Sequence, residues 1–472
     1  MRRKPPSAND YPEWVSFDLI VIGGGPAGIV AATTASGLDK KVALIDNHAE
    51  LGGAGANTGT VPSKTLRETA LALSGMRSRN LYGVDLSLRR EATVTDFLRH
   101  ERGVKAGLNH TLARRMEESK TEVRKGTATF VDARHVRIDE SGEVLESDHI
   151  LIATGSSPVH PPEMSFGLPE VYDSDTILEL DKLPGTLGVV GAGVIGVEYA
   201  CTFAALGTKV HVIDARDVLL SFLDIEISNA LKTAMERNGI VFHWKERCGC
   251  CGSEDGRAVG LNLSSGERLA MDAVLVAAGR KSNIEKLNLG AAGVVAGERG
   301  QIPVNDHYRT NVPNILAVGD VIGFPAMAST SMDQARRAVR HVFAPDRFPA
   351  SASKLLPTGV YTIPEVSMIG ETEESLKAAG VDYIAGRGHY GSSARGRIIG
   401  DLYGFLKLLV RRGDMRVLGV HAIGEQATEL VHIGLMAMLA GASVEIFDEA
   451  CFNIPTLGQL YKAAALDAVR RM

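Results

Sequence analysis

The sequence predicts an α/β protein in which one strand-turn-helix-strand unit occurs twice, followed by a C-terminal domain of a different pattern. The first copy runs from an apolar strand at Phe17 through a glycine-rich turn to an acid at Asp46. The second copy repeats this order from Leu187 to Asp214. After about residue 350, strands alternate with helices and no glycine motif of this kind recurs, so we expect a separate α+β domain.

The first copy carries three glycines between its strand and its helix, Gly23, Gly25 and Gly28. The first glycine allows a tight turn, the second lets a pyrophosphate approach the backbone, and the third lets helix and strand pack closely. The helix N-terminus then offers free N–H groups to the phosphates. Asp46 ends the following strand, where a carboxylate can accept hydrogen bonds from a ribose. The alternative is a glycine-rich turn in an unrelated α/β protein.

The second copy has the same parts, with Gly191, Gly193 and Gly196 in its turn and Asp214 at the end of its second strand. In both copies the acid comes 23 positions after the first glycine, and both strands share the frame K-V-x-x-I-D. Chance does not reproduce glycines, helix, strand and acid at one spacing. We therefore predict two Rossmann-like dinucleotide-binding domains, each on its own parallel sheet.

Three further segments complete the two units. Ala153-Thr154-Gly155 follows a strand of the first unit, and Ala278-Gly279-Arg280 takes the corresponding place in the second. Gly319-Asp320 ends another apolar strand. An acid at the carboxyl end of a parallel strand lies where ligands bind in open α/β sheets. The alternative role for Asp320 is to cap the N-terminus of a helix.

Composition and charge exclude several classes of protein. The 472 residues are 45% hydrophobic and 23% charged, with a net charge of −5 and no strongly basic stretch, so we expect no nucleic-acid partner. No apolar run reaches the roughly 18 residues that a membrane span needs, so we expect no membrane partner. Residues 1–16 are polar and lack the apolar segment of a secretory signal, which predicts a loose N-terminal extension.

Five cysteines, three of them crowded at Cys248, Cys250 and Cys251, do not resemble the disulfide framework of a secreted protein. We therefore expect a cytoplasmic location. The spacing of the three cysteines does not fit a tetrahedral zinc site, and no second pair of ligands lies nearby in the sequence. We expect no metal, and we interpret the cluster as exposed thiols near the end of a strand.

Taken together, these segments resemble the pyridine nucleotide-disulfide oxidoreductases, the family of lipoamide dehydrogenase and glutathione reductase. The resemblance covers residues 17–472 and includes the stretch Gly52 to Lys64. It implies FAD in the first unit, NAD(P)H in the second, and a C-terminal dimerisation domain that forms a homodimer or higher homo-oligomer. The implied domains are an FAD-binding domain at 17–158 and 285–350, an NAD(P)-binding domain inserted at 159–284, and the dimerisation domain at 351–472.

Four positions depart from the family pattern. The family places two redox cysteines five residues apart, where this chain has Gly55 and Thr60. Its thiol-handling base is a His before Pro-Thr with a Glu four residues after that Pro, where this chain has Ile454 and Gln459. Because none of these side chains can form a thiolate or work as that base or its orienting acid, thiol-disulfide exchange is not the expected reaction.

One branch of the family, the soluble pyridine nucleotide transhydrogenases, is similar in several further segments. These are Thr60–Lys64, Tyr172–Asp175, Arg216–Asp224, Tyr361–Glu365 and Phe452–Thr456. The resemblance implies FAD-dependent hydride transfer between NAD(H) and NADP(H). Two alternatives stay open: an NAD(P)H oxidase or diaphorase that passes electrons to oxygen or a quinone, and a flavin-binding structural or sensor protein with negligible turnover.

The resemblance also implies site residues. Lys64 would place a cation near the flavin, and Glu198 is the expected partner of that lysine, because a buried lysine needs one. Alternatively, Lys64 and Glu198 are ordinary helix residues. Besides the glycines and acids of the two motifs, the expected cofactor-binding residues are Gly52, Gly53, Ala128, Thr154, Gly155, Gly279, Gly319 and Asp320.

Two residues of the second unit bear on the choice of nucleotide. A carboxylate at Asp214 accepts hydrogen bonds from the ribose 2′-OH of NAD(H) and repels the 2′-phosphate of NADP(H). Arg216 stands in the next loop, where a guanidinium could bind that phosphate. We therefore expect use of both nucleotides, with NAD(H) bound more tightly. The alternative for Arg216 is a solvent-facing loop residue.

Overall fold

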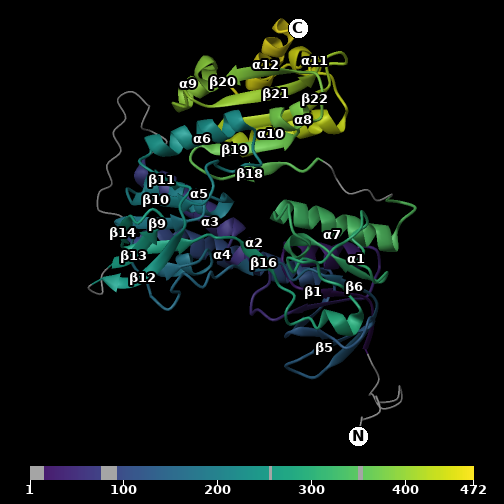
Figure 1. The fold of residues 1–472 in the computed structure, drawn as a ribbon. Coiled ribbons are helices and arrows are strands. Elements are labelled where there is room, and N and C mark those ends of the chain that lie inside the picture. Colours follow the sequence, from purple (N-terminus) through teal and green to yellow (C-terminus); the bar gives the residue numbers. More distant parts are fainter. Residues whose placement is uncertain (1–14, 76–92, 255–257, 349–354) are drawn as a thin grey trace. The chain divides into compact units, whose positions relative to one another are not determined.

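The structure is a computed structural model that describes residues 15–75, 93–254, 258–348 and 355–472 (Figure 1). The chain forms two compact units, each assembled from three stretches of sequence. The first unit contains Met1–Pro62, Arg102–Pro158 and Arg280–Ala352. The second contains Ser63–Glu101, Val159–Gly279 and Ser353–Met472. The predicted extension at 1–16 lies outside the described residues except for its last two, which begin the first strand. The predicted domain boundaries stay predictions.

The first unit is built on a seven-stranded sheet of order β3-β2-β1-β6-β5-β4, with β17 also paired to β6. The strands are β1 (Val15–Ile22), β2 (Val42–Asp46), β3 (Glu122–Lys125), β4 (Ala128–Phe130), β5 (His135–Ile138), β6 (Val144–Ile152) and β17 (Ile315–Ala317). The pairs β1-β2, β2-β3, β1-β6 and β6-β17 are parallel. Leu19 to Ile22 on β1 are almost fully buried, as expected for a central parallel strand.

Helices α1 (Pro26–Ser36) and α7 (Ala328–Phe343) pack together in this unit. Ala31, Ala35 and Ala338 are buried in one cluster with the sheet, and their small side chains let the two helices approach closely. α1 begins with Pro26, which suits the first helical position because its missing N–H would have no partner there. The unit also holds α2 (Gly53–Asn57), the antiparallel pair β7 (Ser156–Pro158) and β16 (Arg280–Ser282), and the 3-10 turns η3 (Leu289–Ala292) and η4 (Gly319–Ile322).

The second unit contains a five-stranded sheet in which every neighbouring pair is parallel, of order β11-β10-β9-β15-β8. Its strands are β8 (Val171–Tyr172), β9 (Thr186–Val190), β10 (Lys209–Asp214), β11 (Val241–Trp244) and β15 (Ala273–Val276). The helices α5 (Val194–Ala205) and α6 (Ile225–Arg237) follow β9 and β10, as the repeat predicts. The predicted second Rossmann-like unit is therefore confirmed.

An antiparallel sheet of β12 (Cys248–Glu254), β13 (Ala258–Leu263) and β14 (Arg268–Met271) follows β11. The predicted cysteine cluster lies on β12. Cys248 is partly buried and forms no disulfide, whereas the side chains of Cys250 and Cys251 lie outside the described residues.

Two long helices, α3 (Thr60–Ser74) and α4 (Val94–Glu118), belong to both units. Within the described residues, none of the helices has the length and apolarity needed to cross a bilayer.

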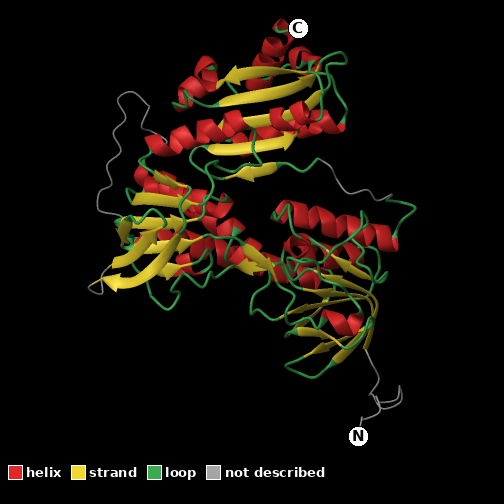
Figure 2. Cartoon of the chain, in the orientation of Figure 1, coloured by secondary structure: helices red, strands yellow, loops and turns green. Residues whose placement is uncertain are grey.

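The C-terminal part of the second unit is an antiparallel sheet of order β18-β19-β22-β21-β20 with helices packed on it, so the predicted α+β domain is confirmed (Figure 2). The strands are β18 (Thr358–Val360), β19 (Glu365–Gly370), β20 (Tyr383–His389), β21 (Phe405–Arg411) and β22 (Val417–Gly424). The helices are α8 (Glu373–Ala378), α9 (Ala394–Ile399), α10 (Ala427–Leu439), α11 (Glu445–Glu449) and α12 (Gln459–Arg470). A side chain at Gly386 or Gly388 would collide with the backbone of α12, so these glycines let the helix lie close to β20.

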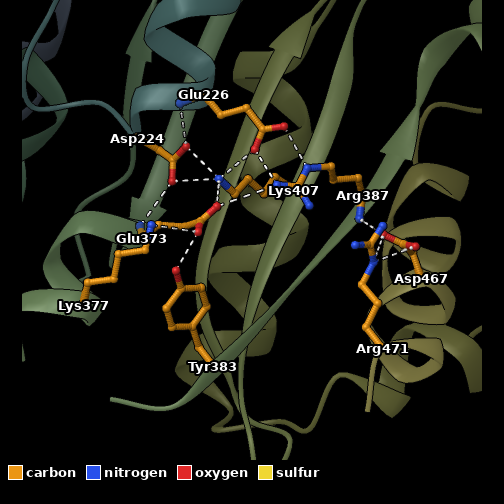
Figure 3. A network of polar contacts seen from close by, with 9 residues as sticks. All are labelled: Asp224, Glu226, Glu373, Lys377, Tyr383, Arg387, Lys407, Asp467 and Arg471. Carbon is orange, nitrogen blue, oxygen red and sulfur yellow. Dashed lines mark hydrogen bonds and ion pairs between the residues drawn. The ribbon is translucent and has the colours of Figure 1, made fainter. Parts of the chain in front are cut away.

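A buried lysine joins α6 to this C-terminal sheet (Figure 3). The Nζ atom of Lys407 on β21 lies 2.8 Å from Asp224 Oδ1, 2.9 Å from Glu226 Oε2 and 2.5 Å from Glu373 Oε1. Asp224 also caps α6, since it accepts the N–H of Glu226 at 3.1 Å. Arg387 on β20 lies 2.6 Å from Glu226. The network therefore links α6, the helix that follows β10, to the C-terminal sheet.

The network shifts the pKa values of its members. Burial opposes the charge of Lys407, but the hydrogen bonds of Asp224, Glu373 and Glu226 raise its pKa above the ordinary range. Burial also opposes the charge of Glu226, yet Arg387 and Lys407 lower its pKa to about 2. The pKa of Glu373 is likewise lowered to about 2 despite burial, because Lys407 and Tyr383 donate hydrogen bonds to it. All three groups are therefore charged at neutral pH.

We predict that this network makes the protein sensitive to acid. A carboxyl with a folded pKa of about 2 and an ordinary unfolded value near 4.3 adds stability above the unfolded pKa that is lost as the pH falls through the folded one. The free energy of unfolding in urea should therefore decline between about pH 5 and pH 2. Lys407→Met should lower it by about 3–5 kcal/mol at pH 7, because it leaves buried carboxylates unpaired.

The matched control is Glu374→Gln, which removes a neighbouring exposed carboxylate on α8. It should change neither the stability at pH 7 nor the acid profile. If Lys407→Met unfolds with the stability and the acid profile of the wild type, the network does not stabilise the fold.

Candidate nucleotide-binding sites

The glycine turn of the first unit gives each glycine a different environment. Gly23 has a φ of +106°, and a side chain there would collide with the carbonyl oxygen of Ala153. A side chain at Gly28 would collide with the carbonyl oxygen of Gly23. A Cβ atom at Gly25 would meet no atom within 4 Å. The first and third glycines are thus required by packing, whereas the second leaves open space at the start of α1, where a pyrophosphate can approach.

The glycine turn of the second unit repeats this arrangement. Gly191 has a φ of +108°, and a side chain there would collide with the carbonyl oxygen of Ala277. A side chain at Gly196 would collide with the carbonyl oxygen of Gly191. At Gly193, before α5, a Cβ atom would again meet nothing within 4 Å. The two turns therefore offer the same open backbone surface to a ligand.

The acid at the end of each second strand is bonded to the turn beside it. Asp46 Oδ2 accepts the N–H of Gly24 at 2.5 Å. Asp214 Oδ2 accepts the N–H of Ala192, the equivalent residue, at 2.7 Å. Since each carboxylate lies next to its glycine turn, a nucleotide whose pyrophosphate sits on the turn can place its ribose at the acid.

Asp214 is also bonded to Arg216, which the sequence does not predict. Its Oδ1 accepts the backbone N–H of Arg216 at 2.8 Å and Nε at 2.9 Å, and its Oδ2 accepts Nη2 at 2.7 Å. Burial alone would raise the pKa of Asp214, but the hydrogen bonds of Arg216 and Ala192 lower it. The carboxylate and the guanidinium that were expected to contact a ribose and a phosphate are thus paired with each other.

The remaining predicted residues of the first unit lie around its glycine turn or support it. Gly52 donates its N–H to Gly24 O at 2.8 Å, and a Cβ at Gly53 would lie 2.9 Å from Gly25, so α2 begins against the turn. Gly155 has a φ of +69° and open space where a side chain would be. Thr154 instead donates its hydroxyl to Asn283 O at 2.7 Å, which makes it a structural contact.

Asp320, Gly319 and Ala128 also belong to the first unit. Asp320 lies in the first turn of η4, where its Oδ2 accepts the hydroxyl of Ser156 at 2.8 Å. It does not cap this turn, because Val318 holds the capping position. Gly319 donates its N–H to Gln334 at 2.8 Å. Ala128 is buried at the start of β4. In the second unit, Gly279 resembles Gly155, with a φ of +122° and open space beside it.

The structure adds a pocket that the sequence analysis missed. A cavity of about 470 Å³ lies just after Asp46 and β2, and it is lined by Ala49, Glu50, Leu51, Asn109, Ala113, Met116, Glu117, Thr121 and Val123. Most of these residues come from α4 and the start of β3. No sequence pattern connects α4 and β3 to the strand that ends at Asp46, so the pocket is apparent only in the folded chain. Because its lining residues Ala49 to Leu51 closely follow Asp46 in the sequence, the pocket would suit the adenosine end of a dinucleotide whose ribose contacts Asp46.

Lys64 and Glu198, predicted as partners, are in contact within the second unit. Lys64 Nζ on α3 lies 2.7 Å from Oε2 of Glu198 on α5, and Glu198 is only 5% exposed. The other carboxylate oxygen accepts the N–H of Tyr361 at 2.8 Å. Lys64 Nζ also lies 5.0 Å from the centre of the Tyr361 ring. The ammonium is therefore held by fixed groups, while its role toward a flavin stays a prediction.

The positions where the family has its thiol chemistry hold other residues in different surroundings. A side chain at Gly55 on α2 would collide with Pro26 at the start of α1. Ile454 is 74% exposed, and Gln459 donates to Phe452 O at 3.4 Å. The sequence has no cysteine in the stretches of the first unit. Cys201 is buried on α5, and burial raises the pKa of its thiol to about 12. A thiolate nucleophile is therefore unavailable at the family's position.

We predict that the glycines of the second turn separate stability from binding. Gly193→Ala should change the free energy of unfolding by less than about 0.5 kcal/mol, because its Cβ meets no atom. It should weaken binding of nicotinamide nucleotides at least about tenfold, since the Cβ occupies the space of the pyrophosphate. Gly196→Ala should instead lower the free energy of unfolding by about 1–3 kcal/mol through overpacking. Thermal melts and nucleotide titrations check both. Unchanged binding by Gly193→Ala would show that the open space is not the phosphate site.

Comparison with known proteins agrees with this geometry. Residues 17–341 match the family described as pyridine nucleotide-disulphide oxidoreductase, and residues 356–465 match its dimerisation domain. The chain is 41% identical over 460 residues to the soluble pyridine nucleotide transhydrogenase of Mycobacterium bovis, covering 97% of this chain and 98% of the relative. It is 40% identical over 466 residues to that of Colwellia psychrerythraea, with the same coverage.

A solved structure is similar as well. The Cu(II) complex of the HOCl-induced flavoprotein disulfide reductase RclA from Escherichia coli superimposes with a TM-score of 0.86 at 27% identity, covering 96% of this chain and 99% of that one. With two parallel sheets that each carry a glycine turn, and with family matches over both parts of the sequence, the chain belongs to the pyridine nucleotide-disulphide oxidoreductase family.

Proposed function

We propose that the protein is an FAD-dependent oxidoreductase that transfers hydride between NAD(H) and NADP(H) without thiol chemistry. One observation carries the proposal: two equivalent nucleotide-binding turns occur in a chain with Gly55 and Thr60 where the family has its redox cysteines. The reaction NADH + NADP⁺ → NAD⁺ + NADPH needs no further electron acceptor. The relatives from Mycobacterium bovis and Colwellia psychrerythraea are named for this activity.

The residues of the first unit fit FAD. The open face of Gly25 suits a pyrophosphate, Asp46 suits a ribose, and the pocket beside Asp46 suits an adenosine. FAD, when bound, supplies the ring that accepts and returns the hydride. The protein has to bind and orient the nucleotides, and the second unit supplies the turn at Gly193 for the nicotinamide nucleotide.

We assign Lys64 the role of a positioned cation that stabilises negative charge on the reduced flavin. Glu198 holds its ammonium at 2.7 Å, and the N–H of Tyr361 fixes the second oxygen of Glu198. A lysine fixed in this way loses little freedom when a ligand binds, so its charge acts at a defined place. Neither residue has to exchange a proton for this role.

We predict that nucleotide oxidation and reduction proceed without thiols. Under argon, NADH should bleach the bound flavin, and thio-NADP⁺ should then restore its colour and become reduced. Alkylation of all accessible cysteines should leave the rate within about twofold of the untreated enzyme, because no thiolate takes part. Lipoamide and glutathione disulfide should not be reduced.

Two outcomes would oppose this account. Restoration of colour by oxygen or a quinone but not by thio-NADP⁺ would favour an oxidase or diaphorase. Loss of nucleotide turnover on alkylation, together with disulfide reduction, would favour the reaction of the family's thiol enzymes. The rates of the untreated and alkylated enzymes are compared in the same buffer. Each rate is divided by the FAD content of its sample, so that loss of FAD is not mistaken for loss of activity.

We further propose a cytoplasmic homodimer formed through the C-terminal sheet and its helices. The cysteine usage supports the reducing compartment. Large exposed hydrophobic side chains support the interface, and the C-terminal domain carries Ile398, Leu402, Tyr403, Met436, Leu439, Ile446, Ile454, Val469 and Met472. Several large apolar side chains exposed on one domain are typical of a surface that another chain covers.

We predict that light scattering gives twice the mass of one chain. The double variant Met436→Asp with Ile454→Asp should shift the protein toward monomer, because it places charges in an apolar interface. Val295→Asp, at an exposed valine of the first unit, is the control and should remain dimeric. A wild type that is monomeric at micromolar concentration would refute the interface.

A further inference from the structure

The end of β11 forms one edge with the loop that carries Arg216. In the β10-β11 ladder, Asp214 pairs with Trp244. The residues that follow these two in the chain therefore lie side by side. The N–H of Lys245 donates to Arg216 O at 3.1 Å, and the N–H of Glu246 donates to Asp214 O at 3.1 Å. Lys245, although distant in sequence, therefore lies beside the loop that follows β10.

The side chain of Lys245 is paired within this edge. Its Nζ lies 3.0 Å from Asp217 Oδ2, and the two side chains are 73% and 58% exposed. Lys245 adopts a φ of +60°, which is uncommon for a residue with a side chain. The edge thus contains two internal ion pairs, Asp214 with Arg216 and Asp217 with Lys245.

These ion pairs leave Asp214, the carboxylate expected to bind a ribose, with little capacity to accept further hydrogen bonds. Asp214 already accepts four hydrogen bonds, three from Arg216 and one from Ala192. A carboxylate offers about four lone-pair sites, so a ribose hydroxyl must displace a bond from Arg216. A 2′-phosphate brings close to two negative charges into a place next to Asp214 and Asp217. One guanidinium, already bound to Asp214, brings a single positive charge to the phosphate, whereas a second cation raises this to two positive charges against its roughly two negative ones.

We propose that Lys245 is the second cation of a subsite for the 2′-phosphate of NADP(H), and that Asp217 competes with the phosphate for it. The inference rests on the proposed function, because only an enzyme that uses both nucleotides needs such a subsite. Arg216 moves from Asp214 to the phosphate and Lys245 moves from Asp217. Both side chains are more than half exposed, so each can rotate away from its present partner.

The test compares ligands that differ only in the 2′-phosphate. Binding of 2′,5′-ADP, 5′-AMP, NADPH and NADH to the FAD-loaded enzyme is measured by calorimetry at low salt. Lys245→Ala should weaken 2′,5′-ADP and NADPH by about three- to thirtyfold, a loss moderated by the exposure of the site. It should leave 5′-AMP and NADH within about twofold. Lys245→Arg should retain the binding, because the charge remains.

Asp217→Asn should have the opposite effect and tighten only the ligands with a 2′-phosphate, since it removes the competing anion. The differences should shrink as salt rises, as expected for exposed charges. Lys209→Ala is the matched control, because Lys209 is an exposed lysine at the other end of β10. It should change none of the four affinities. Thermal melts verify that each variant is folded.

The outcomes separate this inference from the proposed function. A wild type that binds neither NADPH nor 2′,5′-ADP would refute both. A wild type that binds them while Lys245→Ala changes nothing, or weakens all four ligands equally, would overturn the role of Lys245 and leave the proposed hydride transfer standing.

Discussion

The constraint on which the nucleotide-binding parts depend is the contact between the first glycine of each turn and a strand-end carbonyl. Gly23 lies against Ala153, and Gly191 lies against Ala277, so tightly that a side chain has no room at either glycine. The chain can turn there only with a left-handed backbone. This turn sets the start of the following helix, and it is what leaves the second glycine facing open space. The acids that follow are bonded back to the same turns.

Close packing also occupies the space beside Gly55, one of the two positions where the family has its redox cysteines. Gly55 packs on Pro26, the residue that begins α1, so the position no longer has space for a thiol without local movement. The pair of residues that would handle a thiol near the C-terminus is also gone, with Ile454 exposed to solvent. What stays is the machinery that binds nucleotides, together with a lysine held by Glu198 and Tyr361. We therefore propose that the chain keeps the parts of its family that serve hydride transfer and lacks those that serve disulfide exchange.

The features that could be predicted from the sequence are those that depend on residues close together in the chain. Glycines at fixed spacing, apolar strands and terminal acids each act within a few residues, so both Rossmann-like units were within reach. The pairing of Lys64 with Glu198 joins distant residues, and only the resemblance to the family implied it. The contacts that escaped prediction join residues far apart. Lys245 reaches Arg216 only because β10 and β11 are neighbours, and Asn109 of α4 lines a pocket beside Asp46 only in the folded chain. Lys407 and its carboxylates likewise meet across α6, α8 and β21.

We propose that FAD is the one redox centre of the chain, which limits the number of electrons that the enzyme can accept. NADH is added in small steps under argon to a known amount of FAD-loaded enzyme while the flavin absorbance is followed. A flavin without a disulfide accepts one hydride, so we predict that bleaching ends at one NADH per FAD. A titration that consumes two NADH per FAD would reveal a second redox centre and contradict the account.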